Sequence, residues 1–363
     1  MVKNKSLAAV LEEPGKVTLK EFPLPDVGPD EGLLKVEMVG ICSTDVKIYH
    51  GKITHYPLPL IMGHEMVGRI ARIGKNAARR WGVQEGDRVV LEASTSCGSC
   101  EACLTGNYRF CADPLGYGLK TSCDVPPHLW GAYSEYMFIS PGSVVFPIKE
   151  SVPLQAAALV TGVIANGVQW ICLLGRITVG DRILIQGMGV QGLGAIVAAR
   201  EAGAKEIIIS GLSGDQERFD LARRLGADHI VNVEESDLPA FINDLTGKRG
   251  VDMVMDVTGR PQSIALALQV VRKQGVIIEA GLIGGNAEIP FALDTIVQKE
   301  IRLQGARSKG YQATAAAVSI VESGKYPIQE MATDEYPLSE CALALQVAAG
   351  DRGPRPLKVM IRP

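Results

Sequence analysis

The hydrophobic pattern of the chain changes near residue 155. Before that point, short stretches such as GLLKVEMVGI (32–41) and DRVVLEA (87–93) are separated by glycines and prolines. Alternating apolar and polar positions between turn residues are typical of antiparallel strands. The first 160 residues are therefore predicted to form an antiparallel sheet or barrel.

After residue 155, apolar strands alternate with longer helical stretches. The pattern predicts a helix over 154–174, then strands at 182–187, 206–210, 229–233, 251–259 and 276–281, separated by helices at 190–203, 215–227, 238–247 and 263–275. Apolar strands with intervening helices indicate a parallel sheet that helices cover on both faces. The fold class expected for the chain is α/β.

Length and composition narrow the classes of function. A chain of 363 residues with 47% hydrophobic positions has room for about two domains of roughly 100–200 residues each. The chain has a net charge of −3, whereas a nucleic-acid-binding protein would normally have an excess of basic residues. The N-terminus shows no signal peptide, and the most apolar stretch, 183–199, is interrupted by glutamines and glycines. We expect a cytoplasmic protein with no membrane or nucleic-acid partner.

A glycine-rich turn lies between the first predicted strand of the parallel sheet and its helix. Gly187, Gly189 and Gly192 form a G-x-G-x-x-G with Val190 and Gln191 in the variable positions. In a strand–turn–helix context this pattern predicts a dinucleotide site, because the free N–H groups of the helix N-terminus favour a diphosphate. The alternative interpretation is a glycine-rich turn that binds nothing.

The choice between NAD and NADP stays open. The next strand would end in an acid if it bound the ribose hydroxyls of NAD, but Gly211 stands there. Asp215 could still reach the ribose, and Arg218 is expected to face solvent.

Four of the eight cysteines fall within fifteen residues. Their spacing is C-x2-C-x2-C-x7-C, and such clustering in a cytosolic chain favours a metal over disulfides. Four thiolates suit tetrahedral Zn²⁺ and leave no open position, so the site should be structural. Ferredoxin motifs also begin with C-x2-C-x2-C, but they continue with x3-C-P. Unliganded core cysteines are the remaining alternative. The residues are Cys97, Cys100, Cys103 and Cys111.

Taken together, these motifs resemble those of the zinc-containing medium-chain dehydrogenase/reductase family, and the resemblance covers essentially the full length of the chain. The pieces that carry the resemblance are GICSTDVKIYHG, PLIMGHEMVGRI, GDRVV, the four-cysteine lobe, GAYSEY, GMGVQGLG, GADHIVN, GVDMVMDVTG and GVIIEAGLIGG. The branch that it resembles most contains threonine, polyol and secondary-alcohol dehydrogenases.

The resemblance implies two domains. A GroES-like β-barrel catalytic domain would consist of residues 1–160 and 302–363, with the zinc lobe at about 97–111. A Rossmann domain with a doubly wound parallel sheet would bind NAD(P) at 161–301, where Gly211, Ser213 and Gly281 join the glycine-rich turn at the cofactor.

The resemblance also implies a catalytic zinc. Its ligands would be Cys42 and His64, with Glu65 matching a glutamate that binds or swings near the metal. The family usually adds a further ligand where this chain has Thr161 or Gly162, and neither is a good zinc ligand. A Cys42 thiolate, a neutral His64 and a Glu65 carboxylate would balance the charge of Zn²⁺ and leave one position open, so we expect Glu65 to be a direct ligand. A centre without zinc and a more distant ligand are the alternatives.

Further residues near Cys42 receive roles from the same resemblance. Thr44 matches the residue that contacts the alcohol oxygen, and Asp45 matches the acid that orients the histidine ligand. Lys47 stands where many members have a histidine that ends the proton relay. Either Lys47 or the nearby His50 takes that role, or protons leave through the ribose and water. Both Lys47 and His50 could instead be ordinary surface residues.

The expected activity follows from these matches. We expect an oxidoreductase that moves hydride between NAD(P) and a small-molecule secondary alcohol, polyol or amino alcohol, with two zinc ions per subunit, one catalytic and one structural. The alternatives are a zinc-free quinone or enoyl reductase on the same fold and a relative that only binds the cofactor. The resemblance implies a homodimer or homotetramer.

Overall fold

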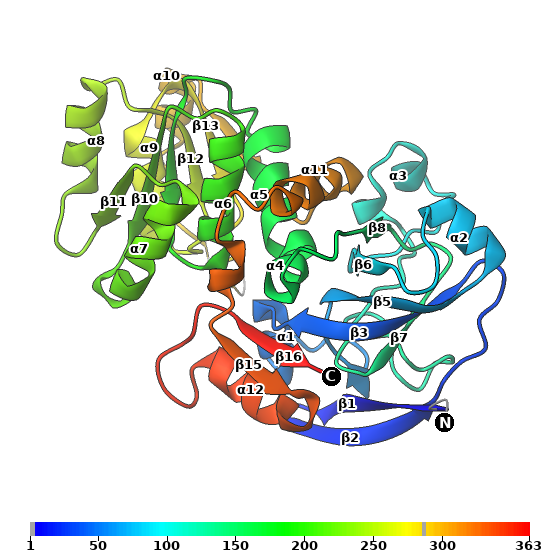
Figure 1. Ribbon diagram of the computed structural model, residues 1–363. Helices are drawn as coiled ribbons and strands as arrows, with labels where there is room; N and C mark the ends of the chain where they lie inside the picture. The colour runs from blue at the N-terminus through cyan, green and yellow to red at the C-terminus, as the bar shows by residue number, and fades with distance from the viewer. Residues whose placement is uncertain (1–3, 285–287) are drawn as a thin grey trace. The chain divides into compact units, whose positions relative to one another are not determined.

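The computed structural model describes residues 4–284 and 288–363. Within them the chain divides into two compact units. The first unit extends to Gly162 and also contains 310–324 and 328–363, and the second contains 163–309 and 325–327. Figure 1 labels most of the helices and strands of both units.

The first unit is built on two sheets of mainly antiparallel strands. One sheet has the order β2-β1-β4, and the other has the order β15-β16-β3-β5-β6-β8, with β7 also paired to β3. The only parallel pair among these described strands joins β15 to β16. The strands are β1 (Lys5–Glu13), β2 (Lys16–Pro23), β3 (Gly32–Gly40), β4 (Leu60–Ile61), β5 (Glu65–Ile73), β6 (Arg88–Leu91), β7 (Tyr136–Ile139), β8 (Val145–Pro147), β15 (Asp334–Pro337) and β16 (Val359–Arg362).

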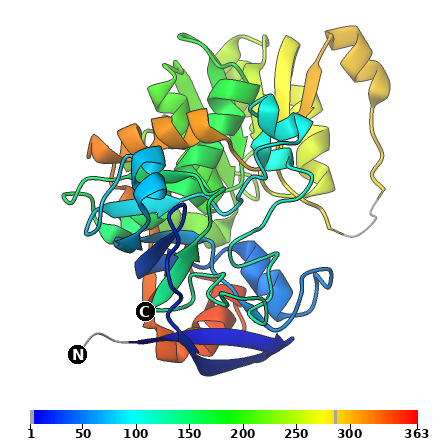
Figure 2. The same ribbon diagram turned by 90° about the vertical axis from the view of Figure 1, so that its right-hand side faces the viewer.

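Short helices close the ends of these sheets. In Figure 2 the C-terminal helix α12 lies beside the β1–β2 hairpin, with which it is in contact. The apolar core of the unit joins inward residues of β1, β3 and β5 to α12. The helices are α1 (Ser43–Tyr49), α2 (Lys75–Trp81), α3 (Glu101–Leu104), η1 (Tyr108–Phe110), α4 (Leu154–Ala158), α11 (Tyr311–Glu322), η5 (Ile328–Met331), η6 (Leu338–Glu340) and α12 (Cys341–Ala349).

The predicted helix over 154–174 is present as one continuous helical stretch, Leu154–Leu174. It contains α4, two π-helical segments, η2 (Val160–Ile164) and η3 (Val168–Leu174), and α5 (Ala165–Gly167) between them. Its length and composition alone would let it cross a membrane, but 78% of its most apolar window is buried, and buried core helices of soluble proteins pass the same test.

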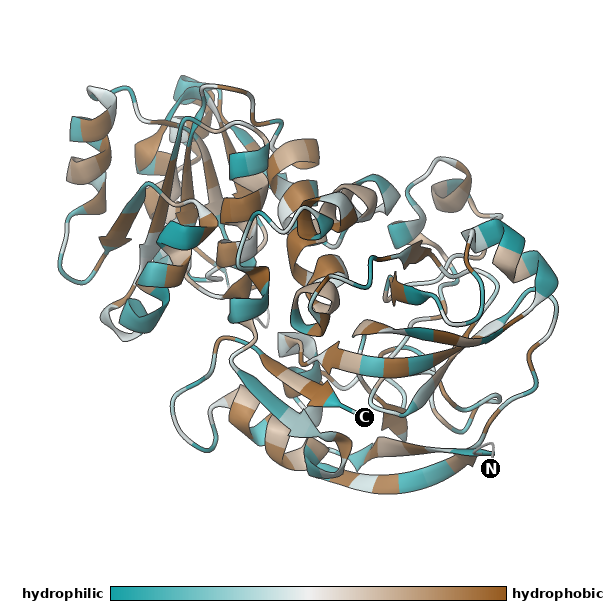
Figure 3. Cartoon of the chain, viewed as in Figure 1, coloured by the Kyte–Doolittle hydropathy of each residue, from teal (hydrophilic) through white to brown (hydrophobic). Residues whose placement is uncertain are grey.

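The second unit is a six-stranded, all-parallel sheet in the order β11-β10-β9-β12-β13-β14. In Figure 3 its central strands are coloured as predominantly hydrophobic, as expected of strands that are buried on both faces. The strands are β9 (Arg182–Gln186), β10 (Glu206–Gly211), β11 (His229–Asn232), β12 (Val251–Asp256), β13 (Val271–Glu279) and β14 (Arg302–Gly305).

Helices cover both faces of this sheet, as the sequence pattern predicts. Helix α6 packs on α5 and α7, and α8 packs on α9. The strand order reverses between β9 and β12, which is where open parallel sheets bind ligands beyond the carboxyl ends of their strands. The helices are α6 (Val190–Glu201), η4 (Ser213–Asp215), α7 (Gln216–Leu225), α8 (Leu238–Thr246), α9 (Pro261–Val270) and α10 (Leu293–Lys299).

Two boundaries differ from the sequence pattern. The helix predicted over 263–275 ends at Val270, and residues 271–274 already belong to β13, whose register with β12 shifts between Val251 and Met253. The β-branched pair Val270–Val271 suits a strand start, and Gln274 adopts a positive φ of 57° that no helix allows. The return to the first unit was expected near residue 302, but β14 pairs with β13, and the first unit resumes at Gly310.

Candidate metal centres and cofactor site

The turn from β3 into α1 positions Cys42. Strand β3 ends at Gly40, and Cys42 is the N-cap of α1. The Asp45 carboxylate accepts a hydrogen bond from the Cys42 backbone N–H at 2.9 Å, which fixes the start of the helix. Asp45 is completely buried, and its same oxygen also accepts a hydrogen bond from the Tyr133 hydroxyl at 3.1 Å.

A glycine turn positions His64 and Glu65 at the start of β5. Gly63 has a φ of +89°, and a Cβ on it would lie 2.4 Å from the Tyr133 ring. Only glycine fits both the backbone conformation and the close approach. Because β5 pairs with β3, with Glu65 opposite Gly40, the turn brings His64 and Glu65 to the end of β3 where Cys42 lies.

The three predicted ligands of the catalytic metal lie together. One potential ligand atom from each of Cys42, His64 and Glu65 lies within 4.8 Å of the others. His64 Nδ1 faces Asp45 Oδ1 at 3.3 Å, so Nε2 is the ring nitrogen left for a metal on the Cys42 side. Those two facing atoms have no other partner within the described residues. A carboxylate behind a histidine ligand is a recurrent arrangement, since it fixes the ring orientation and tautomer.

Glu65 occupies space that two glycines leave open. A Cβ at Gly162 would lie 2.5 Å from the Glu65 carboxyl carbon and from its Oε1, and a Cβ at Gly40 would lie 2.6 Å from its Oε2. Any side chain at residue 162 would therefore displace the carboxylate. In this chain the carboxyl group of Glu65 lies where the family usually has the side chain of a further zinc ligand.

Glu65 is also one half of a buried ion pair. Its Oε2 accepts a hydrogen bond from the ammonium group of Lys358, which precedes β16, and both side chains are almost fully buried. Buried charges in a protein interior are stable only when they are paired or bind a metal. A carboxylate has two oxygens, so a bond to Lys358 leaves the other oxygen available.

The charges around Cys42 and His64 support each other. Burial and the Glu65 carboxylate raise the pKa of the Cys42 thiol, but the hydrogen bond and charge of His64 and the charge of Lys358 outweigh them, and the net direction is down. Burial alone would lower the pKa of His64, whereas Asp45 and Cys42 raise it well above its usual range. The thiolate, which is the form that binds a metal, is therefore favoured at Cys42.

The other residues predicted near the reaction lie on α1. Thr44 and Lys47 are three positions apart, so they share one face of the helix. Both are half-buried, and no hydrogen bond or ion pair holds the Lys47 ammonium within the described residues. His50 instead contacts Asp351 at 3.2 Å. Of the two relay candidates, Lys47 is the one without a competing partner.

The four-cysteine lobe has the geometry of a tetrahedral metal site. One sulfur from each cysteine lies within 4.8 Å of the others, and none of the four forms a disulfide. Two measured pairs are Cys97–Cys103 at 3.9 Å and Cys100–Cys103 at 3.5 Å between sulfurs. Zn–S bonds of about 2.3 Å in a tetrahedron place sulfurs about 3.8 Å apart. The measured separations lie on either side of that value.

Backbone N–H groups point at the sulfurs of the lobe. The N–H of Cys100 donates to Cys97 Sγ at 3.4 Å, and that of Cys97 donates to Cys111 Sγ at 3.3 Å. Hydrogen bonds from Ser99 and Cys100 lower the pKa of the Cys97 thiol to about 6. The lobe thus favours the thiolate at Cys97, whereas burial and the neighbouring thiols raise the pKa of Cys103 to about 12 as long as no cation is bound.

The glycine-rich turn of the second unit has the form that a dinucleotide site requires. Gly187 directly follows β9 with a φ of +108°, and a Cβ on Gly192 would lie 1.9 Å from the Gly187 carbonyl oxygen. Gly189 is the N-cap of α6, and the space beside it is open. These are the three separate roles of the glycines: the tight turn, the approach of a diphosphate and the close packing of helix on strand.

The end of β10 differs from the expectation for Arg218. Rather than facing solvent, its guanidinium pairs with Asp215 at 2.7 Å and reaches the Met188 carbonyl oxygen of the glycine turn at 3.4 Å. Asp215 in turn accepts from the N–H of Leu212 at 3.0 Å, directly after Gly211. The Asp215 carboxylate already pairs with the Arg218 guanidinium, so its oxygens are divided between Arg218 and any ribose hydroxyl.

Other cofactor candidates lie at the same edge of the sheet. The N–H of Ser213 donates to Glu234 at 2.8 Å, and its hydroxyl accepts from Asn232 at 3.0 Å. Gly281 follows β13, and a Cβ on it would lie 2.3 Å from the backbone nitrogen of Gly259. The two segments can approach this closely only because residue 281 is a glycine.

Two acids meet at this edge, a buried Asp256 and a half-buried Glu279 whose carboxyl oxygens are inaccessible. Asp256 ends β12 and Glu279 ends β13, on neighbouring strands. Thr258 donates to one Asp256 oxygen at 2.8 Å, whereas the other Asp256 oxygen and both Glu279 oxygens receive no donor from the described chain. Burial and the neighbouring Asp256 raise the pKa of Glu279 to about 8. A proton shared between the two carboxyl groups satisfies both.

Sequence reasoning does not single out Lys358, Tyr133, Asp256 or Glu279. A lysine within the apolar C-terminal stretch PLKVMIRP, and acids that end the strands VDMVMD and VIIE, are the signals that could have found three of them. Tyr133 lies in the quoted stretch GAYSEY, but nothing local indicates its contact with Asp45, which lies 88 residues away.

Known proteins share both units of this chain. Residues 28–150 match the family described as "Alcohol dehydrogenase GroES-like domain", and residues 191–323 match "Zinc-binding dehydrogenase". The chain belongs to the zinc-binding alcohol dehydrogenase family. The predicted fold of a GroES-like domain with a Rossmann-type domain is thereby confirmed, and so is the class of activity, an alcohol oxidoreductase that uses NAD(P).

Individual members of the family match nearly end to end. A Mycobacterium tuberculosis protein named "Probable alcohol dehydrogenase adh" is 35% identical, with 98% of both chains covered. An erythritol/L-threitol dehydrogenase of Mycolicibacterium smegmatis is 31% identical over 100% of this chain and 99% of its own. The crystal structure of an alcohol dehydrogenase from Thermotoga maritima has a TM-score of 0.90 at 26% identity, covering 99% of both chains.

Removing one thiolate of the lobe of this dehydrogenase should cost stability. We expect Cys100→Ser to lower the melting temperature in zinc-containing buffer, because metal binding to the lobe contributes folding free energy. The matched control is Cys172→Ser, a half-buried thiol outside both cysteine–histidine clusters. Calorimetry with zinc analysis measures both, and unchanged melting of Cys100→Ser with two zinc ions retained would contradict a structural zinc.

Glu279→Gln should remove a pH-dependent loss of stability. The pKa of Glu279 is raised from 4.5 to about 8 in the folded chain, so between these values the folded state holds a proton that the unfolded state has lost. Raising the pH through this range therefore favours unfolding of the native chain, and the glutamine variant escapes this effect. The stability of Glu279→Gln relative to the native chain should rise from acidic to alkaline pH.

Urea unfolding at a series of pH values checks this expectation. The matched control is Glu235→Gln, an exposed acid of the same unit, which should follow the native chain at every pH. A difference between Glu279→Gln and the native chain that stays constant with pH would show that the acid pair does not hold a proton.

Proposed function

We propose that this chain interconverts polyols or secondary alcohols and their carbonyl products with NAD(P), at a catalytic zinc bound by Cys42, His64 and Glu65. The observation that carries the proposal is the gathering of one ligand atom from each of these residues within 4.8 Å, with Glu65 seated in the space above Gly162. A second, structural zinc belongs to the four-cysteine lobe. Both sites together give two zinc ions per subunit.

The donor set of the first centre fits zinc. One thiolate and one carboxylate balance the charge of Zn²⁺, and His64 would supply a neutral nitrogen once zinc displaces the proton that Asp45 and Cys42 favour in its absence. Three protein ligands leave one tetrahedral position, as catalytic zinc sites require. Zinc bound there supplies Lewis-acid polarisation of the alcohol or carbonyl oxygen, and NAD(P) accepts or returns the hydride.

The chain's own residues orient this centre. Asp45 holds the His64 ring through Nδ1 and is itself fixed by the Cys42 N–H and the Tyr133 hydroxyl. Lys358 holds one oxygen of Glu65 and offsets the cost of burying its charge. We assign Lys358 as a positioning residue that directs the free oxygen of Glu65 toward the metal.

Proton transfer from the alcohol is assigned to α1. Thr44 follows Cys42 by two residues and shares a helix face with Lys47. A hydroxyl can both accept and donate a hydrogen bond. Thr44 can therefore accept the proton of the alcohol while it gives its own hydroxyl proton to the next group. Lys47 is the next group on that face and is assigned the exit, because His50 is already paired with Asp351.

The proposed cofactor contacts lie around the carboxyl edge of the second unit. The diphosphate would bind at Gly187, Gly189, Val190, Gln191 and Gly192, where the N-terminus of α6 offers free N–H groups. Gly211 and Ser213 would lie beside the adenosine ribose, and Gly281 on the nicotinamide side of the strand-order reversal. The pairing of Asp215 with Arg218 gives both cations and anions at the ribose, so the proposal covers NAD and NADP.

The substrate class rests on the relatives. The match over the full length of an erythritol/L-threitol dehydrogenase favours a small polyol, and the secondary and amino alcohols stay within the proposal. The balance of charge and the lack of a basic excess support a cytoplasmic enzyme without nucleic-acid or membrane partners. Assembly as a homodimer or homotetramer is proposed from the family resemblance.

Cys42→Ser tests the catalytic centre. With the thiolate removed, we expect turnover of every alcohol in a panel of polyols, secondary alcohols and amino alcohols to be lost, and zinc to fall from two ions to one per chain. The melting temperature should stay close to that of the native enzyme, because the lobe is intact. NAD(P)H absorbance and elemental analysis measure the two results.

The matched control for this experiment is Cys123→Ser. Cys123 is a buried thiol that belongs to neither metal cluster, so two zinc ions and turnover should persist. Near-native turnover in Cys42→Ser would refute the zinc assignment. Absence of turnover by the native chain on the whole panel, with two zinc ions bound, would refute the substrate class.

Gly162→Ala tests whether Glu65 is a ligand. The new Cβ would lie 2.5 Å from the carboxyl group and push it away from its present place. We expect Gly162→Ala and Glu65→Gln to share one phenotype, loss of the zinc at Cys42 with the lobe zinc retained. The control is Gly305→Ala, whose Cβ would meet no atom within 4 Å. If Gly162→Ala kept two zinc ions and full turnover, Glu65 would not be the completing ligand.

A further inference from the structure

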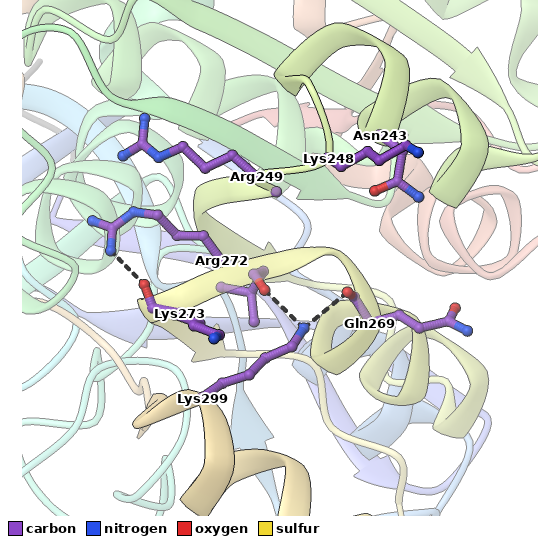
Figure 4. A pocket seen from close by; sticks show the side chains of 9 residues that line it. Asn243, Lys248, Arg249, Gln269, Arg272, Lys273 and Lys299 are labelled. Atoms are coloured by element: carbon purple, nitrogen blue, oxygen red, sulfur yellow. Dashed lines mark hydrogen bonds between the residues drawn. The ribbon is translucent and has the colours of Figure 1, made fainter.

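A basic pocket lies at the amino edge of the parallel sheet of the second unit. It has a volume of about 470 Å³ and lies where β12 and β13 begin and α8, α9 and α10 end. Five of its lining residues are cationic, and none of the lining residues, all within the described chain, is acidic. The five are Lys248, Arg249, Arg272, Lys273 and Lys299, drawn in Figure 4.

One buried acid beneath the pocket fixes the two arginines. Asp252, which is almost fully buried, accepts from Arg249 Nη2 at 2.8 Å and from Arg272 Nε at 2.5 Å. Its other oxygen accepts from the Arg182 backbone N–H at 2.8 Å. Both guanidinium groups therefore lie beside the same Asp252 oxygen. In Figure 4 the two arginine side chains extend in the same direction. Each guanidinium has further N–H donors that Asp252 does not use.

The lysines divide into one that is occupied and two that are free. Lys299 donates to the carbonyl oxygens of Leu268, Gln269 and Val271 at 2.8–3.0 Å, and so caps the end of α9. For the exposed Lys248 and Lys273, the described residues provide no acceptor to the ammonium group. Arg272 also donates from Nη1 to the Lys273 carbonyl oxygen at 2.7 Å, as Figure 4 shows. Two ammonium groups and the remaining N–H groups of the two guanidinium groups are thus available around one recess.

Helix ends do not account for this much positive charge. The carboxyl ends of α8, α9 and α10 each present about half a negative charge, and cations near them are stabilising. With the full charge of Asp252 added, these groups offset about two and a half of the five positive charges. About two and a half positive charges remain uncompensated, which matches a phosphate monoester or diphosphate rather than a single chloride.

We propose that this pocket binds a small phosphorylated molecule, through bidentate contacts from Arg249 and Arg272 and charge contacts from Lys248 and Lys273. Planar guanidinium forks fit phosphate oxygens, and the volume is that of a small-molecule site. A recess of this size, rather than a long basic stripe, argues against a nucleic acid as the occupant.

The pocket is separate from the cofactor edge. β12 extends from Val251, next to the pocket, to Asp256 at the opposite edge. Six strand residues span about 20 Å. A ligand here cannot be the diphosphate of the cofactor bound at Gly189, so the proposal does not depend on the proposed catalytic function.

The test is calorimetric titration of the full-length protein with inorganic pyrophosphate. The protein is first saturated with NAD(P)H, so that the glycine-rich turn is filled. We expect one pyrophosphate per chain, and an affinity about tenfold weaker or worse in Arg249→Gln/Lys273→Gln, because two charge-assisted contacts are lost. The control Arg223→Gln/Lys205→Gln removes the same two residue types from exposed positions of the same unit and should bind like the native protein.

A second variant guards against a folding defect, since Arg249 also contacts Asp252. Lys248→Gln/Lys273→Gln leaves both arginine–aspartate pairs intact and should weaken binding as well. Equal affinity in both pocket variants and the control would overturn the proposal. So would binding of citrate more tightly than pyrophosphate, or binding of a single-stranded oligonucleotide, but not pyrophosphate, that depends on these side chains.

Discussion

The close approach of the Glu65 carboxyl group to the backbone of Gly162 is the constraint on which the candidate zinc centre depends. Residue 162 can carry no side chain while Glu65 holds its place, and the same is true of Gly40 on the other side. A carboxylate enclosed in this way needs a counter-charge, and Lys358 provides one from the C-terminal end of the chain. A single missing side chain thus explains the position of an acid and the presence of a buried lysine.

The parts of the site that could be predicted from sequence are those set by short spacings. The lobe cysteines lie within fifteen residues and the glycines of the turn within six, so local geometry brings each set together. Cys42 and His64 needed the family resemblance. Lys358 lies 293 residues from Glu65, and the turn of Arg218 toward Met188 depends on packing around the glycine loop. Such long-range pairs have no local signal. At the end of α9 the β-branched pair Val270–Val271 is a local signal, but the helical pattern continues past it, and only the pairing of β13 with β12 decides the boundary.

Buried acids define the two edges of the parallel sheet in opposite ways. At the carboxyl edge, Asp256 and Glu279 face each other without a cation, and a shared proton stabilises them. At the amino edge, burial raises the pKa of Asp252. The hydrogen bond from the Arg182 N–H and the Arg272 and Arg249 guanidinium groups have the larger, opposite effect, so the pKa of Asp252 lies below its usual value. The acid pair with one shared proton thus keeps one negative charge at the carboxyl edge, whereas the amino edge carries excess positive charge. The same scaffold offers two electrostatically distinct sites.

Glu65 is proposed to complete a zinc centre with Cys42 and His64. Anomalous diffraction at the zinc absorption edge, on crystals of the native enzyme, locates each zinc ion and its ligands. We expect two peaks per chain, one inside the four-cysteine lobe and one bonded to Cys42 Sγ, His64 Nε2 and a Glu65 oxygen, at the distances of about 2.0–2.3 Å that zinc ligands show. A second peak whose ligands exclude Glu65, with its carboxylate paired to Lys358 alone, would show that Glu65 is not a ligand.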